Sequence, residues 1–66
     1  MSYRDVATRL KRAGFVCART SKHDVYVHKA KNVTVPLPRH SGDIPKGMLR
    51  AIIKEAGFSV DYFLSL

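Results

Sequence analysis

Two amphipathic helical patterns bracket a β-rich middle, and this order constrains the fold more than any other feature of the chain. In the first pattern the apolar residues recur at helical spacing and share one face: Tyr3, Val6, Ala7, Leu10 and Ala13. Ser2 is suited to cap this helix, with Asp5 adding negative charge in its first turn. Gly14 is suited to end it.

The second pattern follows a proline and ends at a glycine. Pro45 fits the first turn of a helix, and Gly57 is placed to stop it. Between them lies one apolar face, made of Leu49, Ile52, Ile53 and Ala56. Ser59 is placed to cap a final helical turn that runs to Leu64.

The middle of the chain predicts three short strands. The first runs from Phe15 to about Arg19 and the second from His23 to about Lys29, with a polar turn at 20–22. The third is Val33–Val35, which we expect to end at Pro36 and Pro38 because proline has no N–H to donate. The order α-β-β-β-α predicts a two-layer α+β sandwich, with the helices on one face of an antiparallel sheet. Residues 39–43 are expected to form a loop.

Length limits what the chain can contain. Its 66 residues predict one domain, 1–66, which buries only about 60% of its unfolded surface and is marginally stable without a partner. No apolar run approaches the roughly 20 residues that cross a bilayer, and no leader pattern opens the chain, so we expect a cytoplasmic protein. Cys17 is the only cysteine, which excludes an internal disulfide and a cysteine-based zinc finger. We expect its side chain to be buried as a small hydrophobic group.

Charge is the dominant global signal. Twelve Lys and Arg against five Asp and Glu give a net charge of +7 and a pI near 10.1. This balance predicts attraction to a polyanion, meaning nucleic acid, an anionic membrane surface or an acidic protein. The basic residues are spread along the chain, which favours a folded basic surface over a disordered arm. The alternative is a charge that serves solubility alone.

One stretch combines a proton-transfer group with a phosphate-binding group. His23 follows Lys22 at the predicted start of the second strand. Imidazole exchanges protons near neutral pH, and an ammonium group attracts phosphate. Because RNA carries its own nucleophile in the 2′-hydroxyl, these two groups suffice to favour RNA cleavage with His23 as general base or general acid. The alternative is an ordinary surface histidine at a strand start.

The other two histidines have weaker patterns. Side chains alternate across a strand, so His28 falls on the face opposite His23 and is expected to be half-exposed, within reach of RNA. His40 precedes the second helix, where free N–H groups favour a phosphate; the alternative is an imidazole that ties the loop to backbone. The three histidines follow no metal-ligand spacing, so neither a metal nor another cofactor is expected.

Several basic residues are candidates for holding the phosphate near these histidines. The proposed RNA-binding and phosphate-binding set is Arg19, Lys22, Arg39, His40 and Lys46. Each of the four lysines and arginines is equally consistent with a solvated surface. Tyr26 either stacks on a base or is an ordinary outward-facing tyrosine of a sheet.

The order and spacing of several short pieces resemble one known family over nearly all 66 positions. The pieces are residues 12–15 (RAGF), 22–28 (KHDVYVH), 33–36 (VTVP), 39–47 (RHSGDIPKG) and 49–57 (LRAIIKEAG). The chain is similar to the HicA-type toxins, the small RNA-cleaving half of a bacterial toxin–antitoxin pair. The resemblance implies a fold like a double-stranded-RNA-binding domain, endoribonuclease activity on messenger RNA, and a catalytic histidine at His23.

The resemblance also implies a protein partner. The family pairs with an antitoxin, called HicB, and a chain with a charge of +7 favours a negatively charged partner that covers His23. The sequence departs from the family at Ser21 and Lys22, where Gly-Ser or Gly-Gly is typical; the lysine either strengthens phosphate binding or crowds a tight turn. Leu37 and Pro38 are expected to lengthen the loop that carries His40.

Two classes of function compete at this point. The first is a metal-independent endoribonuclease that leaves a 2′,3′-cyclic phosphate and a 5′-hydroxyl. The second is a non-catalytic RNA-binding module that uses the same basic surface. A DNA-binding protein is a weaker third possibility, because the two helices lack a helix-turn-helix pairing.

Overall fold

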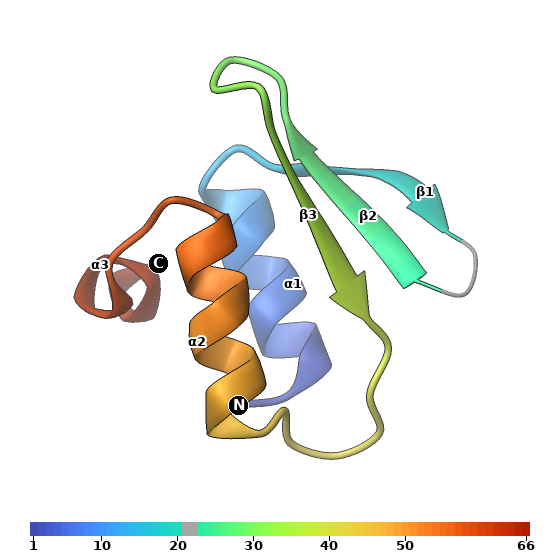
Figure 1. The fold of residues 1–66 in the computed structure, drawn as a ribbon, viewed down its shortest axis with the longest axis vertical. Helices are drawn as coiled ribbons and strands as arrows, with labels where there is room; N and C mark the ends of the chain where they lie inside the picture. The colour runs from blue at the N-terminus through green and yellow to red at the C-terminus, as the bar shows by residue number, and fades with distance from the viewer. Residues whose placement is uncertain (21–22) are drawn as a thin grey trace.

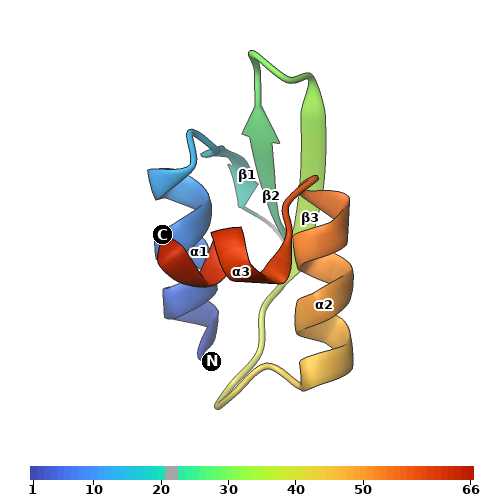
Figure 2. The same ribbon diagram turned by 90° about the vertical axis from the view of Figure 1, so that its left-hand side faces the viewer.

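The computed structural model describes residues 1–20 and 23–66. Its elements are α1 (Tyr3–Arg12), β1 (Val16–Thr20), β2 (His23–His28), β3 (Val33–Pro38), α2 (Lys46–Glu55) and α3 (Val60–Ser65) (Figure 1). The strands form one antiparallel sheet in the order β1-β2-β3. The helices lie on one face of this sheet, and α3 crosses between α1 and α2 (Figure 2). The predicted α+β sandwich with α-β-β-β-α order is confirmed, with the last predicted turn forming a short helix.

The predicted helix ends are set by local hydrogen bonds. Ser2 Oγ accepts a hydrogen bond from the Asp5 N–H at 3.2 Å, which satisfies one of the free donors at the start of α1. At the start of α3, Ser59 Oγ likewise accepts a hydrogen bond from the Tyr62 N–H, with 3.1 Å between the two atoms. Gly14 follows α1 with a φ of +104°, a backbone conformation that residues other than glycine rarely adopt. The chain therefore turns into β1 where the sequence predicts.

Strand β3 is longer than predicted. It continues through both prolines, with Pro36 opposite Val25 and Pro38 opposite His23. The expected stop at Pro36 is wrong because β3 lies at the edge of the sheet, where alternate N–H groups point away from the neighbouring strand and a proline costs no ladder bond. Leu37 and Pro38 consequently belong to the strand and do not lengthen the loop that carries His40.

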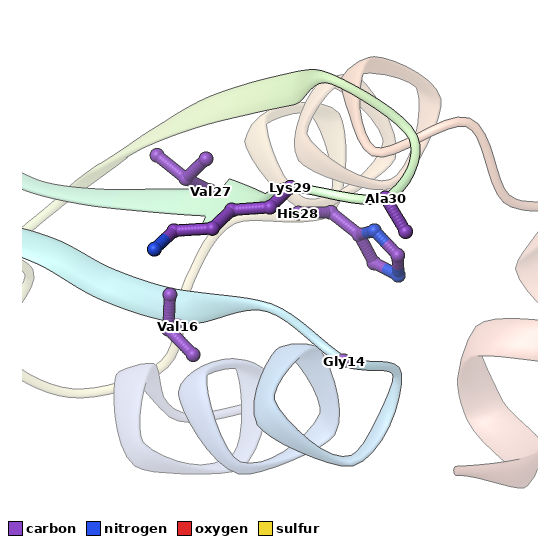
Figure 3. Close-up of a pocket in the computed structure, with 6 residues that line it drawn as sticks. All are labelled: Gly14, Val16, Val27, His28, Lys29 and Ala30. Carbon is purple, nitrogen blue, oxygen red and sulfur yellow. The ribbon is translucent and has the colours of Figure 1, made fainter.

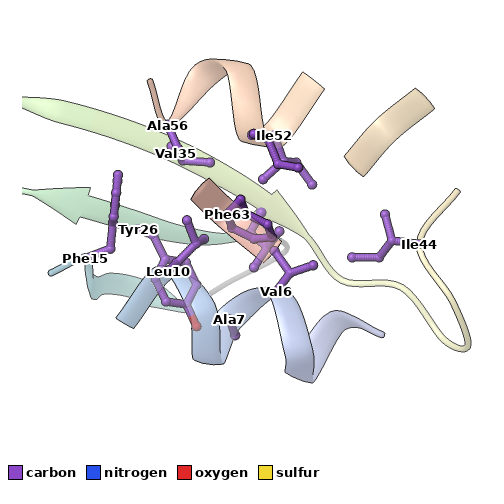
Figure 4. Close-up of a cluster of buried hydrophobic side chains, with 12 residues drawn as sticks. Val6, Ala7, Leu10, Phe15, Tyr26, Val35, Ile44, Ile52, Ala56 and Phe63 are labelled. Atoms are coloured by element: carbon purple, nitrogen blue, oxygen red, sulfur yellow. The ribbon is translucent and has the colours of Figure 1, made fainter. Parts of the chain in front are cut away.

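The core lies between the sheet and the helices (Figure 4). Its largest fully buried side chains are Phe15, Phe63, Leu10, Leu37, Ile53, Val6 and Val35. Tyr26 is only 3% exposed, so neither its predicted role in stacking on a base nor an outward orientation holds. Cys17 is exposed, contrary to the prediction, because β1 is the other edge strand and Cys17 borders a surface hollow instead of the core.

Candidate functional site

One face of the sheet is left uncovered by the helices, and His23 lies on it. Asp24 and Tyr26 are buried, so the intervening residues of β2 point to the opposite side. Directly opposed residues of neighbouring strands share a face. The register therefore defines an open face made of Val16, Arg19, His23, Val25, Val27, Thr34, Pro36 and Pro38. The His23 side chain is exposed there, accessible to a large ligand.

A β-bulge brings Arg19 onto the same face as His23. The pairing of β1 with β2 shifts between Cys17 and Arg19, so that Arg19 lies opposite Val25. Without this extra residue, alternation from Val16 would turn Arg19 toward the helices. Because His23 and Val25 share a face, Arg19 lies diagonally across from His23, a separation of about 7–8 Å that a long side chain spans. Of the predicted phosphate-binding residues that the structure describes, Arg19 is the one the register places beside His23.

Arg39 is engaged with a carboxylate on the other face. Its Nη2 lies 3.2 Å from Asp24 Oδ1 and its Nε lies 3.4 Å from the same oxygen. The Asp24 side chain is 9% exposed and that of Arg39 is 60% exposed. Removal of Arg39 would leave the nearly buried Asp24 carboxylate without a compensating charge, which destabilises a fold. Arg39 therefore holds the loop against the start of β2, and the Asp24 carboxylate partly neutralises its positive charge.

The loop that carries His40 is held at both ends. Arg39 fixes its beginning, while the Ile44 N–H donates to Met1 O at 2.8 Å and Asp43 lies 3.8 Å from the N-terminal ammonium. His40 itself is exposed, and within the described residues its ring makes no hydrogen bond. The predicted tie between His40 and backbone is thus not present in that part of the chain.

One predicted residue lies apart from His23, and another lies outside the part of the chain that the structure describes. Lys46 is exposed at the start of α2. In both views the loop after β3 separates the start of α2 from the start of β2 (Figures 1 and 2). Lys22, together with Ser21, lies outside the described residues.

His28 belongs to a different environment at the far end of β2. Its ring packs against Phe15 with centroids 5.2 Å apart, and its Nδ1 accepts a hydrogen bond from the Lys31 N–H at 3.2 Å. It is half-buried on the face opposite His23, as alternation predicts. A hollow of about 250 Å³ beside it is lined by His28, Gly14, Val16, Val27, Lys29 and Ala30 (Figure 3). His28 therefore orders the β2–β3 turn and does not complete a pair with His23.

Tyr26 is a titratable side chain within the core and is only 3% exposed. Burial, the nearby Cys17 thiol and the Asp24 carboxylate raise the pKa of Tyr26.

Among the described residues no three His, Cys, Asp or Glu side chains gather as metal ligands. In the same residues no helix is long and apolar enough to cross a membrane.

The geometry supports one kind of chemistry on the open face. An accessible imidazole with a guanidinium diagonally beside it can exchange a proton and hold a phosphate. Sequence reasoning missed the bulge and the Asp24–Arg39 pair. Neither has a signal in a single sequence, because both depend on how separate segments align.

The family match agrees with this geometry. Residues 3–58 match the model of the HicA toxin of bacterial toxin–antitoxin systems. The chain belongs to the HicA toxin family. No individual curated protein matches it.

Membership gives this HicA-family chain the role of the toxin in a toxin–antitoxin pair. The match ends at residue 58, before α3, yet Phe63 of α3 is fully buried in the core. The fold of this HicA-family chain thus depends on residues beyond the matched range.

Proposed function

We propose that this toxin is a metal-independent endoribonuclease that cleaves messenger RNA in the cytoplasm, with His23 as the general acid or base. The observation that carries the proposal is the exposed His23 on an uncovered sheet face, with Arg19 diagonally beside it. A net charge of +7 favours binding of the RNA backbone. Family membership supports the assignment of a toxic activity.

The chemistry uses the nucleophile that RNA supplies. His23 accepts the proton of a 2′-hydroxyl while that oxygen forms a bond to the adjacent phosphorus. The bond from phosphorus to the 5′-oxygen of the next nucleotide breaks with its electron pair, and that oxygen takes up a proton from water. His23 then returns the proton it accepted to the solvent. The products are a 2′,3′-cyclic phosphate and a 5′-hydroxyl. Arg19 stabilises the negative charge that gathers on the phosphoryl oxygens.

The antitoxin partner is proposed to be of the HicB type and to bind over the open face. Val16 is 50% exposed on this face, and Val25 and Val27 lie beside it. Partly exposed aliphatic side chains next to the Arg19 cation offer an apolar centre with a polar rim, an arrangement typical of protein interfaces. An acidic partner seated there excludes RNA from His23. A structure of the complex that leaves His23 open would contradict this model of inhibition.

The product ends test the proposed reaction. Purified protein is incubated with an RNA of defined sequence in the presence of EDTA, and the fragments are identified by mass spectrometry. We expect cleavage to persist in EDTA and the 5′ fragments to end in a cyclic phosphate. A 2′-deoxy substitution at the cleaved position should abolish cleavage there. Fragments with 3′-hydroxyl ends, or loss of activity in EDTA, would contradict the proposal.

A further inference from the structure

A second concave surface lies on the face of the sheet that the helices cover. It is formed between α1 and the β1–β2 hairpin, on the opposite side of β2 from His23, and has a volume of about 510 Å³. We call it the α1 groove. Its lining is Tyr3, Arg4, Ala7, Thr8, Lys11, Cys17, Thr20, Asp24 and Tyr26. Neither the open-face chemistry nor the hydrophobic core accounts for this hollow.

The walls of the α1 groove carry uncharged hydroxyl groups. The Tyr3 hydroxyl is buried and has no hydrogen-bond partner among the described residues. The Tyr26 hydroxyl lies at the α1 side of the core, beside Ala7 (Figure 4). Thr8 and Thr20 add hydroxyl groups from the helix and the strand. A ligand with its own donors and acceptors satisfies such groups better than an aliphatic side chain does.

The charges at the groove favour a ligand attached to a phosphate. Arg4 and Lys11 are exposed on the α1 side of it. Asp24 is the one acidic side chain among the lining residues, and its charge is offset by Arg39. Both hydrogen bonds from Arg39 go to Asp24 Oδ1, so Oδ2 accepts none from the described residues. The groove thus combines a cationic rim with one nearly buried acceptor.

The position of the groove connects it to the open face. Asp24 directly follows His23, and Thr20 lies opposite Asp24 at the end of the paired region. Neighbouring residues of a strand are about 3.3 Å apart and point to opposite faces. His23 and the α1 groove therefore both border the start of β2, on opposite faces of the sheet.

We infer that the α1 groove binds one nucleobase of the RNA, next to the phosphodiester that lies at His23. The base carries an exocyclic amino group, as in cytosine, because Asp24 Oδ2 can accept its hydrogen bond. Uracil offers a carbonyl oxygen at that position. This inference rests on the proposed ribonuclease function and adds to it a subsite that selects the base beside the cut.

The binding test uses single nucleotides, so that it does not depend on cleavage. The ¹⁵N-labelled protein is titrated with CMP, UMP and inorganic phosphate, and backbone amide shifts are followed by NMR. CMP should shift the amides of Thr8, Cys17 and Thr20 and bind about tenfold more tightly than UMP, the effect of one hydrogen bond to a charged group. Shifts equal for inorganic phosphate and CMP, equal affinity for CMP and UMP, or shifts confined to the open face would each overturn the inference.

A variant that fills the groove provides the second measurement. Thr8→Phe places a large ring at an exposed lining position, and Ala51→Phe is its matched control on the exposed side of α2. Far-ultraviolet circular dichroism checks that both fold. Thr8→Phe should weaken CMP binding about tenfold, the size of one lost base contact, while Ala51→Phe should leave it unchanged. Unchanged binding in Thr8→Phe would also overturn the inference.

The two proposals can fail separately. Base-selective shifts in a protein that does not cleave RNA would retain the groove and remove the nuclease function. Cleavage with no base-selective shift at Thr8, Cys17 or Thr20 would retain the nuclease and remove the groove. Shifts at these residues caused only by an acidic antitoxin segment would assign the groove to protein binding, against the inference.

Discussion

At the scale of single residues, Arg19 depends on the β-bulge for its position beside His23. The shift in register between Cys17 and Arg19 turns its side chain to the open face. Arg39, which directly precedes His40 in the sequence, instead pairs with Asp24 of the covered face. Two arginines that were both proposed to hold the phosphate therefore have different surroundings and are expected to have different roles.

Replacement of Arg19 tests its role in cleavage. Arg19→Ala removes a cation that faces the phosphate, and loss of one such stabilising group costs about 10²-fold in rate in well-ordered sites. Because Arg19 is exposed, we expect a smaller loss, about tenfold, measured under single-turnover conditions. Arg12→Ala, which lowers the net charge equally from an exposed position on α1, is the control. Equal loss in the two variants would show that only total charge matters.

Tyr26 predicts how stability responds to alkaline pH. Its pKa is raised by burial first and then by Cys17 and Asp24, so the unfolded chain ionises before the folded one does. Below the ordinary tyrosine pKa of about 10 both states hold the proton and its contribution to stability is complete. Above it the unfolded state binds fewer protons, so the free energy of unfolding falls as pH rises.

The Tyr26→Phe variant isolates this contribution. Urea unfolding at a series of pH values above 9 should show a shallower decline in the variant than in the wild type. Tyr62→Phe is the matched control, because Tyr62 is 49% exposed and should leave the decline unchanged. The same decline in wild type and Tyr26→Phe would contradict the raised pKa.

At the scale of elements, helix periodicity and capping residues predicted the helices well. Ser2, Gly14 and Ser59 act locally, so a single sequence reveals them. The end of β3 was mispredicted because an edge position, which tolerates Pro36 and Pro38, is a property of the assembled sheet. Cys17 was mispredicted for the same reason. The alternation that separates His23 from Asp24 and Tyr26 was predictable. Which of the two faces lies open was not, because Tyr26 was expected to face outward and is buried. The bulge that brings Arg19 to the face of His23 was not predictable either.

Helix α3 is expected to be essential for folding. Phe63→Ala removes a fully buried aromatic ring, which costs about 3–5 kcal/mol in a typical core. A domain of this size has a stability of the same order, so the variant should be largely unfolded at 37 °C by circular dichroism. Leu64→Ala, on the same helix but at a 49% exposed position, should change the free energy of unfolding by less than about 0.5 kcal/mol. A folded Phe63→Ala protein would show that α3 is dispensable.

At the scale of the whole molecule, binding and cleavage depend on different features. The charge of +7 is spread over the surface and attracts RNA without selecting a bond to break. His23 is one residue within that surface, on the face that the helices leave open. Loss of its imidazole should leave the electrostatic attraction almost intact. This separation distinguishes an endoribonuclease from a module that only binds RNA.

The most direct test compares His23→Ala with the wild type in one preparation of RNA and EDTA. Single-turnover cleavage and equilibrium binding are measured side by side, and circular dichroism verifies folding. His40→Ala is measured for comparison, because His40 is an exposed histidine proposed to bind phosphate and not to catalyse. We predict that His23→Ala slows cleavage by about 10²-fold or more, the contribution of a general acid or base, with RNA affinity within about twofold of wild type. Cleavage by His23→Ala at the wild-type rate would contradict the account.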